Sequence, residues 1–126
     1  MVESTITAIV IDDDLDTVEL FCEYLELKGI QVIGKGYDGK EAVELYQKIK
    51  PDIVFLDMMM PHYNGFYAVE GIQKVEPNAK IIMVTADLTS DTAQKLDELK
   101  LPVIYKPYDL DDVMITIHKL LQHDMM

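Results

Sequence analysis

A chain of 126 residues with 49% hydrophobic and 27% charged residues is long enough to bury a sizeable core, which excludes a disordered protein. Its 11 basic and 23 acidic residues give a net charge of −12, which argues against direct binding of nucleic acid, because phosphate contacts need clustered Lys and Arg. The single cysteine excludes an intrachain disulfide. The sequence shows neither a signal peptide nor a run of the ~20 apolar residues that a membrane span needs. We therefore expect a cytoplasmic protein without membrane insertion.

The first elements alternate between strand and helix patterns. Residues 6–11 predict a strand, and Asp14 then predicts the N-cap of a helix that Gly29 ends. Residues 30–34 form a shorter and more polar run, which is typical of an edge strand. The apolar residues at helical spacing, expected to be buried, are Leu15, Val18, Phe21, Cys22 and Leu25.

The middle of the chain repeats this alternation around a strongly apolar run. Asp38 and Glu41 form a capping pair at the start of a second helix, which ends at Pro51. Residues 53–57 predict a strand buried on both faces, and the Pro, Asn and Gly of residues 58–65 predict a loop. A third helix follows, in which Gly71 is a mild weakness.

The last elements complete the pattern. Residues 81–85 predict a fourth strand, and Thr89, Ser90 or Asp91 caps a polar and therefore loosely held helix over 91–100. Residues 103–105 predict a fifth strand, and the final helix, capped by Asp109, buries Leu110, Val113, Ile117 and Leu120 or Leu121. Five strands alternating with five helices predict an α/β fold in which helices cover both faces of a parallel sheet.

Polar side chains stand at the C-terminal ends of four of these strands, where parallel sheets place their ligand sites. They are Asp12 with Asp13, Asp57, Thr85 and Lys106. Like charges at ~4 Å repel by about 4 kcal/mol per pair at moderate dielectric, so this cluster needs a cation or shifted pKa values. Oxygen ligands with some bound water favour Mg²⁺.

Each of these residues also has a purely structural interpretation. Asp57 can be a turn residue or a cap, Lys106 an ordinary surface lysine, and Thr85 a β-branched strand residue. Pro107 can simply begin the last helix, or the Lys106–Pro107 peptide bond can be cis. As a set, however, they supply the parts of phosphoryl transfer to a carboxylate: an ionised nucleophile, and a cation and a lysine that neutralise the transferred oxygens.

The chain resembles the receiver domain of two-component response regulators over nearly its whole length. The residues that carry the resemblance are Asp12-Asp13, Asp57, Met60-Pro61 with Gly65, Thr85-Ala86 and Lys106-Pro107. The resemblance implies a flavodoxin-like doubly wound fold, with five parallel strands in the order 2-1-3-4-5, formed by residues 1–126 as a single domain.

The resemblance also implies roles for the acidic residues. Asp57 corresponds to the phosphoacceptor. Asp13, Asp57 and the backbone carbonyl of Met59 would bind Mg²⁺, and Asp12 would hold the ion through water.

A second group of residues would respond to the phosphoryl group. Lys106 and Thr85 would contact it, and Thr85 with Tyr105 would form a switch that changes the face made by the fourth helix, the fifth strand and the fifth helix. The phosphodonor would be a phosphohistidine on a sensor histidine kinase or a histidine phosphotransfer protein, while the output partner stays unidentified. Such a protein is a signalling switch that assists its own phosphorylation and dephosphorylation rather than an enzyme, and we expect a monomer or weak dimer.

The sequence departs from the family pattern in two places. Leu99-Lys100-Leu101-Pro102 stands where many receivers have Gly-Ala, which leaves the path of the fourth helix open, and Tyr108 stands where Phe is frequent. Because no output domain follows the last helix, we expect either a stand-alone receiver of the chemotaxis or sporulation-relay type or a domain excised from a longer protein, and we favour the first.

Two other interpretations compete with this one. The motif Asp12-x-Asp14 resembles the nucleophile motif of haloacid-dehalogenase-type phosphatases, which would make Asp12 the nucleophile and leave Asp57 unexplained. The other alternative is a receiver-like binding module that is never phosphorylated.

Overall fold

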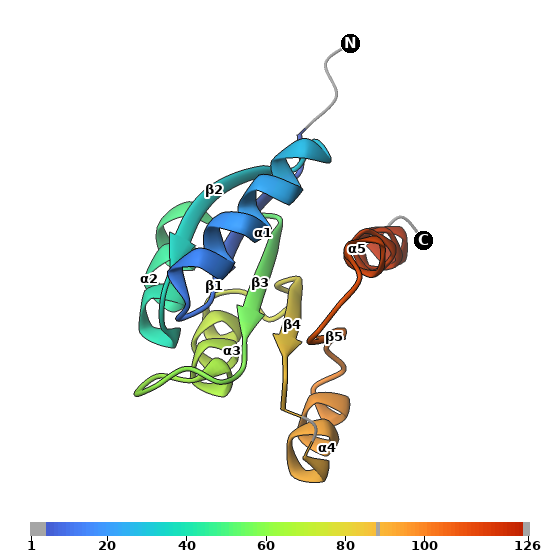
Figure 1. The fold of residues 1–126 in the computed structure, drawn as a ribbon. Helices are drawn as coiled ribbons and strands as arrows, with labels where there is room; N and C mark the ends of the chain where they lie inside the picture. The colour runs from blue at the N-terminus through green and yellow to red at the C-terminus, as the bar shows by residue number, and fades with distance from the viewer. Residues whose placement is uncertain (1–4, 88, 125–126) are drawn as a thin grey trace.

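The computed structural model in Figure 1 describes residues 5–87 and 89–124, and these alternate strictly between strand and helix as predicted. The elements in chain order are β1 (Thr7–Ile11), α1 (Leu15–Leu27), β2 (Gln31–Gly36), α2 (Gly39–Ile49), β3 (Ile53–Asp57), α3 (Gly65–Val75), β4 (Ile81–Thr85), α4 (Ser90–Glu98), β5 (Val103–Tyr105) and α5 (Leu110–Asp124).

The strands form one parallel sheet in the order β2-β1-β3-β4-β5, which confirms the predicted flavodoxin-like topology. β3 lies at the centre, where Ile11 of β1 pairs with Leu56 and Val84 of β4 pairs with Asp57. Because all strands run in the same direction, their carboxyl ends meet at one edge of the sheet, to which the arrowheads of β3 and β4 point in Figure 1.

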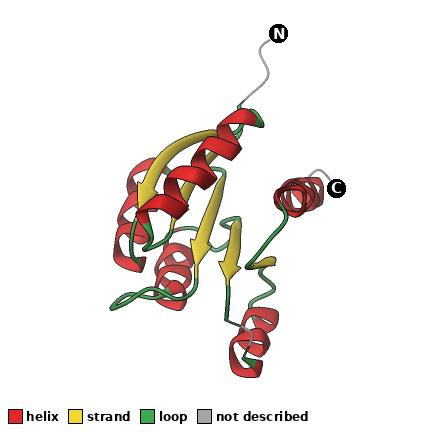
Figure 2. Ribbon diagram, viewed as in Figure 1, coloured by secondary structure: helices red, strands yellow, loops and turns green. Residues whose placement is uncertain are grey.

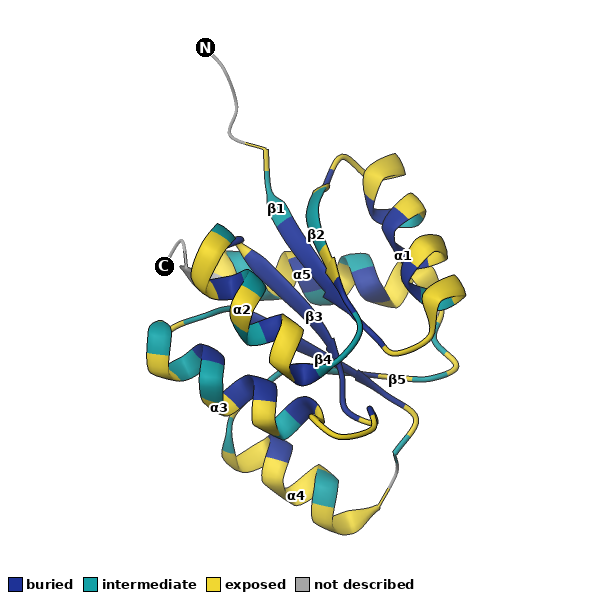
Figure 3. Cartoon of the chain, turned by 90° about the vertical axis from the view of Figure 1, so that its left-hand side faces the viewer, coloured by how far each residue is buried: buried dark blue, intermediate teal, exposed yellow. Residues whose placement is uncertain are grey.

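The sheet separates the core into two layers, because successive strand residues point to opposite faces. Val10 and Phe55 pack on the side of α1 and α5, whereas Ile11 and Leu56 pack on the side of α2, α3 and α4. Figure 2 shows helices on both sides of the strands, and Figure 3 shows β1, β3 and β4 as the most continuously buried part of the chain. β3 and β4 are buried at every position, as expected for central strands of such a fold.

The helices begin where the sequence predicted, but the hydrogen bonds at their N-termini differ from one helix to another. At α2, the Asp38 carboxylate accepts the Glu41 N–H at 2.8 Å, and the Glu41 carboxylate accepts the Tyr37 N–H at 2.7 Å, which completes the capping pair. At α1, Asp14 holds the N-cap position, yet its carboxylate accepts the Thr17 hydroxyl rather than a backbone N–H. The free amides at that end of α1 therefore have no cap from Asp14.

Three details of the sequence-based interpretation are wrong. Leu15 and Leu110 were expected in the core, but they are 61% and 41% exposed, and each is the first residue of its helix. β2 continues to Gly36 instead of ending at residue 34, since its pairing with β1 extends to that residue.

α4 is the helix that the core holds least. Thr89 provides its N-cap, and Leu96 is its only buried residue. The helix ends at Glu98, and Lys100 then adopts a left-handed backbone conformation with φ 57°. This turn settles the path of the chain through the segment in which the sequence departs from the family pattern.

α2 and α3 lie against each other on one face of the sheet (Figure 3). A Cβ atom on Gly71 of α3 would lie 2.5 Å from a methyl carbon of Val43 in α2, so the glycine permits this close approach. Among the described residues, no helix combines the length and the apolar character needed to span a membrane.

Candidate functional site

Asp57 lies at the centre of the site, at the C-terminal end of the central strand β3, and is only 5% exposed. The Met59 N–H points to its Oδ1 atom at 3.5 Å. Asp12 directly follows the neighbouring strand β1 and is 6% exposed, and its Oδ1 accepts the Asp14 N–H at 3.0 Å. The parallel pairing of β1 and β3 therefore brings two buried carboxylates to adjacent positions.

The predicted acidic cluster is present in the structure. Carboxylate oxygens of Asp12, Asp13 and Asp57 all lie within 4.8 Å of one another, with Asp13 on the exposed side. Burial, followed by the charge of Asp12, raises the pKa of Asp57 from 3.8 to about 6, although Lys106 and the Met59 N–H oppose this. Burial and the hydrogen bond and charge of Asp12 also raise the pKa of Asp13.

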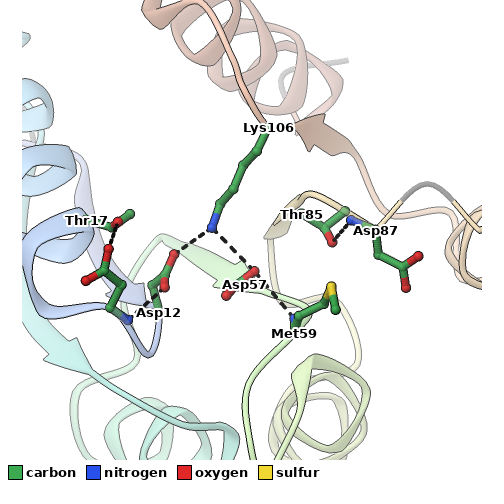
Figure 4. Close-up of polar contacts among 8 residues, drawn as sticks. Asp12, Thr17, Asp57, Met59, Thr85, Asp87 and Lys106 are labelled. Atoms are coloured by element: carbon green, nitrogen blue, oxygen red, sulfur yellow. Dashed lines mark hydrogen bonds and ion pairs between the residues drawn. The ribbon is translucent and has the colours of Figure 1, made fainter.

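Lys106 reaches over this cluster from the end of β5 (Figure 4). Its Nζ lies 2.9 Å from Oδ2 of Asp12 and 3.6 Å from Oδ1 of Asp57. Burial lowers the pKa of Lys106, but the hydrogen bond to Asp12 and the charge of Asp57 outweigh this effect and raise it. The lysine is therefore the ammonium that partly balances the buried carboxylates, and the peptide bond that follows it, to Pro107, is cis.

The donor set fits a hard divalent cation. It consists of oxygen atoms alone, and burial together with the charge of Asp12 raises the pKa of Asp57 despite the opposing charge of Lys106, so a bound cation would favour the ionised carboxylate. In the loop that follows, Met58 and Met60 are buried, whereas Met59 is 58% exposed. The side chains of Met58 and Met60 therefore serve as packing, and we expect any ligand from Met59 to come from its backbone.

Thr85 ends β4 beside Asp57 and is fully buried. Its hydroxyl oxygen accepts the N–H of Asp87 at 3.0 Å (Figure 4). The Asp87 carboxylate in turn accepts the Thr89 N–H at 2.9 Å and the Thr92 hydroxyl at 2.7 Å, and these hydrogen bonds lower the pKa of Asp87. This network connects the site directly to the first turn of α4.

The sequence-based interpretation missed Asp87. The sequence did contain a signal, because Asp87 stands two residues before Thr89 and five before Thr92. An Asp at this spacing can accept hydrogen bonds from a backbone N–H and from a hydroxyl at the start of a helix.

Tyr105 lies in β5 opposite Thr85, and its side chain is 42% exposed. The backbone of the two strands continues this pairing, because the Lys106 N–H donates to the Thr85 carbonyl at 2.8 Å. Tyr108 turns inward instead, with its ring 5.8 Å from that of Phe21 in an edge-on arrangement. The structure thus brings the predicted site residues to one edge of the sheet, with Tyr105 on the outer surface beside it.

Comparison with known proteins agrees with this geometry. The family model described as the response regulator receiver domain matches residues 8–118. The chemotaxis protein CheY of Thermotoga maritima is 33% identical over 115 residues, which cover 89% of this chain and 94% of that protein. The chemotaxis protein CheY of Listeria monocytogenes is 30% identical over 114 residues, which cover 88% of this chain and 94% of that protein.

Solved structures show the same fold. The CheX–CheY–BeF3–Mg²⁺ complex from Borrelia burgdorferi contains a chain that superposes with a TM-score of 0.86 at 26% identity, over 92% of this chain and 89% of that one. The non-phosphorylated HemR receiver domain from Leptospira biflexa superposes with a TM-score of 0.82 at 28% identity, over 91% of this chain and 93% of that one.

Proposed function

The chain belongs to the response regulator receiver domain family, and we propose from this premise that residues 1–126 form one receiver domain that is switched by phosphorylation of Asp57. The observation that carries the proposal is the position of Asp57, a buried carboxylate between a cation-binding set of oxygens and the ammonium of Lys106. The phosphodonor would be a sensor histidine kinase or a histidine phosphotransfer protein.

In the proposed reaction, a carboxylate oxygen of Asp57 attacks the phosphorus of the donor's phosphohistidine. The new O–P bond forms as the P–N bond breaks, and the electron pair of that bond leaves with the imidazole nitrogen, which takes up a proton from water. Because the pKa of Asp57 is about 6, its carboxylate is mostly ionised at neutral pH, so no general base is needed.

The residues around Asp57 would prepare it for this reaction. Asp13, Asp57 and the Met59 carbonyl would hold Mg²⁺, with Asp12 acting through water, and the ion would neutralise charge on the transferred oxygens. Lys106, now in contact with Asp12 and Asp57, is close enough to pair with the incoming phosphoryl group.

Phosphorylation would be read out through Thr85. Its hydroxyl now accepts from the Asp87 N–H, and donation to a phosphoryl oxygen would draw it toward Asp57. The space that it leaves could admit the ring of Tyr105, and α4 is the element least able to resist the change. A partner bound to the face of α4, β5 and α5 would then distinguish two shapes of the protein.

The test is intact-protein mass spectrometry after incubation with acetyl phosphate and Mg²⁺. We expect one acid-stable, base-labile phosphoryl adduct on the wild type and none on Asp57→Asn. A full-strength adduct on Asp57→Asn, mapped to Asp12, would instead support the phosphatase interpretation. Absence of any adduct on the wild type would favour a binding module that is not phosphorylated.

The geometry already weighs against Asp12 as the nucleophile. One of its oxygens accepts the Asp14 N–H, and the other contacts the Lys106 ammonium at 2.9 Å. Both oxygens are therefore engaged, whereas Asp57 has only the longer contacts of 3.5 and 3.6 Å.

A further inference from the structure

The first residue of α2, Gly39, contacts the loop that follows Asp57. The N–H of Gly39 donates to the carbonyl oxygen of Tyr63 at 2.7 Å. The first amides of a helix lack partners inside the helix, so this hydrogen bond satisfies one of them with an acceptor from another segment. The backbone of α2 and the loop between β3 and α3 are thus joined directly, without a side chain between them.

This contact leaves no room for a side chain at position 39. A Cβ atom there would lie 2.5 Å from the carbonyl oxygen of Asn64 and 2.7 Å from that of Tyr63. Both obstacles are backbone atoms, which cannot rotate away as a side chain can. Any residue larger than glycine therefore has to displace the loop, α2, or both.

The displaced loop is in turn connected to the phosphoacceptor. Asn64 is the N-cap of α3, and the next residue, Gly65, donates its N–H to the Met58 carbonyl at 3.0 Å. A Cβ atom on Gly65 would lie only 2.9 Å from the carbonyl oxygen of Asp57, so α3 begins in direct contact with the backbone of that residue. A shift at Asn64 thus reaches Met58 and Asp57 through short, rigid contacts.

We propose that Gly39 is a positioning residue for the cation site: its lack of a side chain allows α2 to hold the segment 57–65 where Asp57 and the Met59 carbonyl can bind Mg²⁺ together. This inference rests on the proposed function, because it assumes that the acidic cluster binds Mg²⁺. Mg²⁺ tolerates little departure from octahedral geometry at 2.0–2.1 Å. A displacement well below 1 Å is therefore enough to weaken binding.

The experiment measures Mg²⁺ affinity by isothermal titration calorimetry of the unphosphorylated protein, for the wild type, Gly39→Ala and Gly71→Ala. Gly71→Ala is the matched control, because it adds the same methyl group to the contact between α2 and α3, where the obstacle is a Val43 side chain away from the loop. Both variants should lose stability. Only Gly39→Ala should bind Mg²⁺ about tenfold more weakly, as is usual when a contact that supports a metal ligand is lost.

A second measurement on the wild type needs no variant and covers the case in which Gly39→Ala does not fold. In an NMR titration with Mg²⁺, the amide resonance of Gly39 should move with saturation, because its acceptor lies in the segment that the ion orders. The resonance of Gly71 should stay in place.

The outcomes distinguish a failure of the role proposed for Gly39 from a failure of the proposed Mg²⁺ site. Equal Mg²⁺ affinity of Gly39→Ala and the wild type, or a Gly39 resonance that does not respond, would show that the loop absorbs the change and would overturn the role of Gly39 alone. Lack of Mg²⁺ binding by the wild type would overturn the proposed cation site and this inference together.

Discussion

Replacing Asp57 with Asn should make the metal-free protein more stable. The pKa of Asp57 is raised from 3.8 to about 6 in the folded state, mainly by burial and the charge of Asp12, so folding disfavours its ionised form. Each pKa unit corresponds to 1.36 kcal/mol, which gives about 3 kcal/mol for this shift. Water at the edge of the sheet screens part of this penalty, and we therefore expect Asp57→Asn to gain about 2 kcal/mol at pH 7.5.

The sign of the pH dependence follows from proton binding. Between pH 3.8 and about 6 the folded wild type holds a proton on Asp57 that the unfolded chain has released, so this group makes the wild type less stable as pH rises through that window. The advantage of Asp57→Asn should therefore be nearly absent below pH 4, grow up to about pH 6 and stay constant above it.

The assay is urea unfolding in EDTA at several pH values between 3.5 and 7.5. Asp97→Asn, which removes one exposed negative charge from α4, controls for net charge and should change little. Adding Mg²⁺ at about a hundred times its dissociation constant should stabilise the wild type by about 2.7 kcal/mol and remove the advantage of the variant. Equal stability of Asp57→Asn and the wild type at pH 7.5 in EDTA would refute the reasoning about the buried charge.

Three further predictions concern the metal, the switch and the core. Asp13→Ala should abolish most of the rise in melting temperature that Mg²⁺ gives the wild type; an undiminished rise would place the ion elsewhere. Thr85→Ala should still accept beryllofluoride, a phosphoryl mimic, but should lose most of the amide NMR shift changes between residues 89 and 108; changes as large as in the wild type would contradict a switch through the hydroxyl. Gly71→Ala should lower stability by about 1–3 kcal/mol through overpacking, despite better helix propensity, and Val43→Ala should restore part of it; a stabilised single variant would contradict the packing geometry.

The site could be predicted largely from sequence because its residues directly follow apolar strands. Once β1, β3, β4 and β5 are recognised as parallel, their carboxyl ends must share an edge, and this alone brings Asp12, Asp57, Thr85 and Lys106 together. The distances and pKa shifts depend on burial and could not be obtained from the sequence.

Errors arose where local patterns do not report tertiary contacts. Leu15 and Leu110 continue an apolar spacing, but periodicity alone does not show that the first residue of each helix stays exposed. The strand predicted over residues 30–34 continues to Gly36, because its pairing with β1 extends that far. Gly39 was not singled out from the sequence, because only the structure shows the backbone of a distant loop against it.

The weak attachment of α4, through one buried leucine and the hydrogen bonds of Asp87 to its first turn, has a consequence for signalling in the absence of phosphate. Burying one leucine side chain stabilises a structure by about 2 kcal/mol, and the partly buried Leu99 adds less than that. An arrangement of α4 that lies about 2 kcal/mol above the observed one would be adopted by roughly 3% of molecules at any moment. A partner that binds this minority would receive a low basal signal in the absence of phosphorylation. Phosphorylation would then increase the population that the partner binds, and so strengthen an output that already exists.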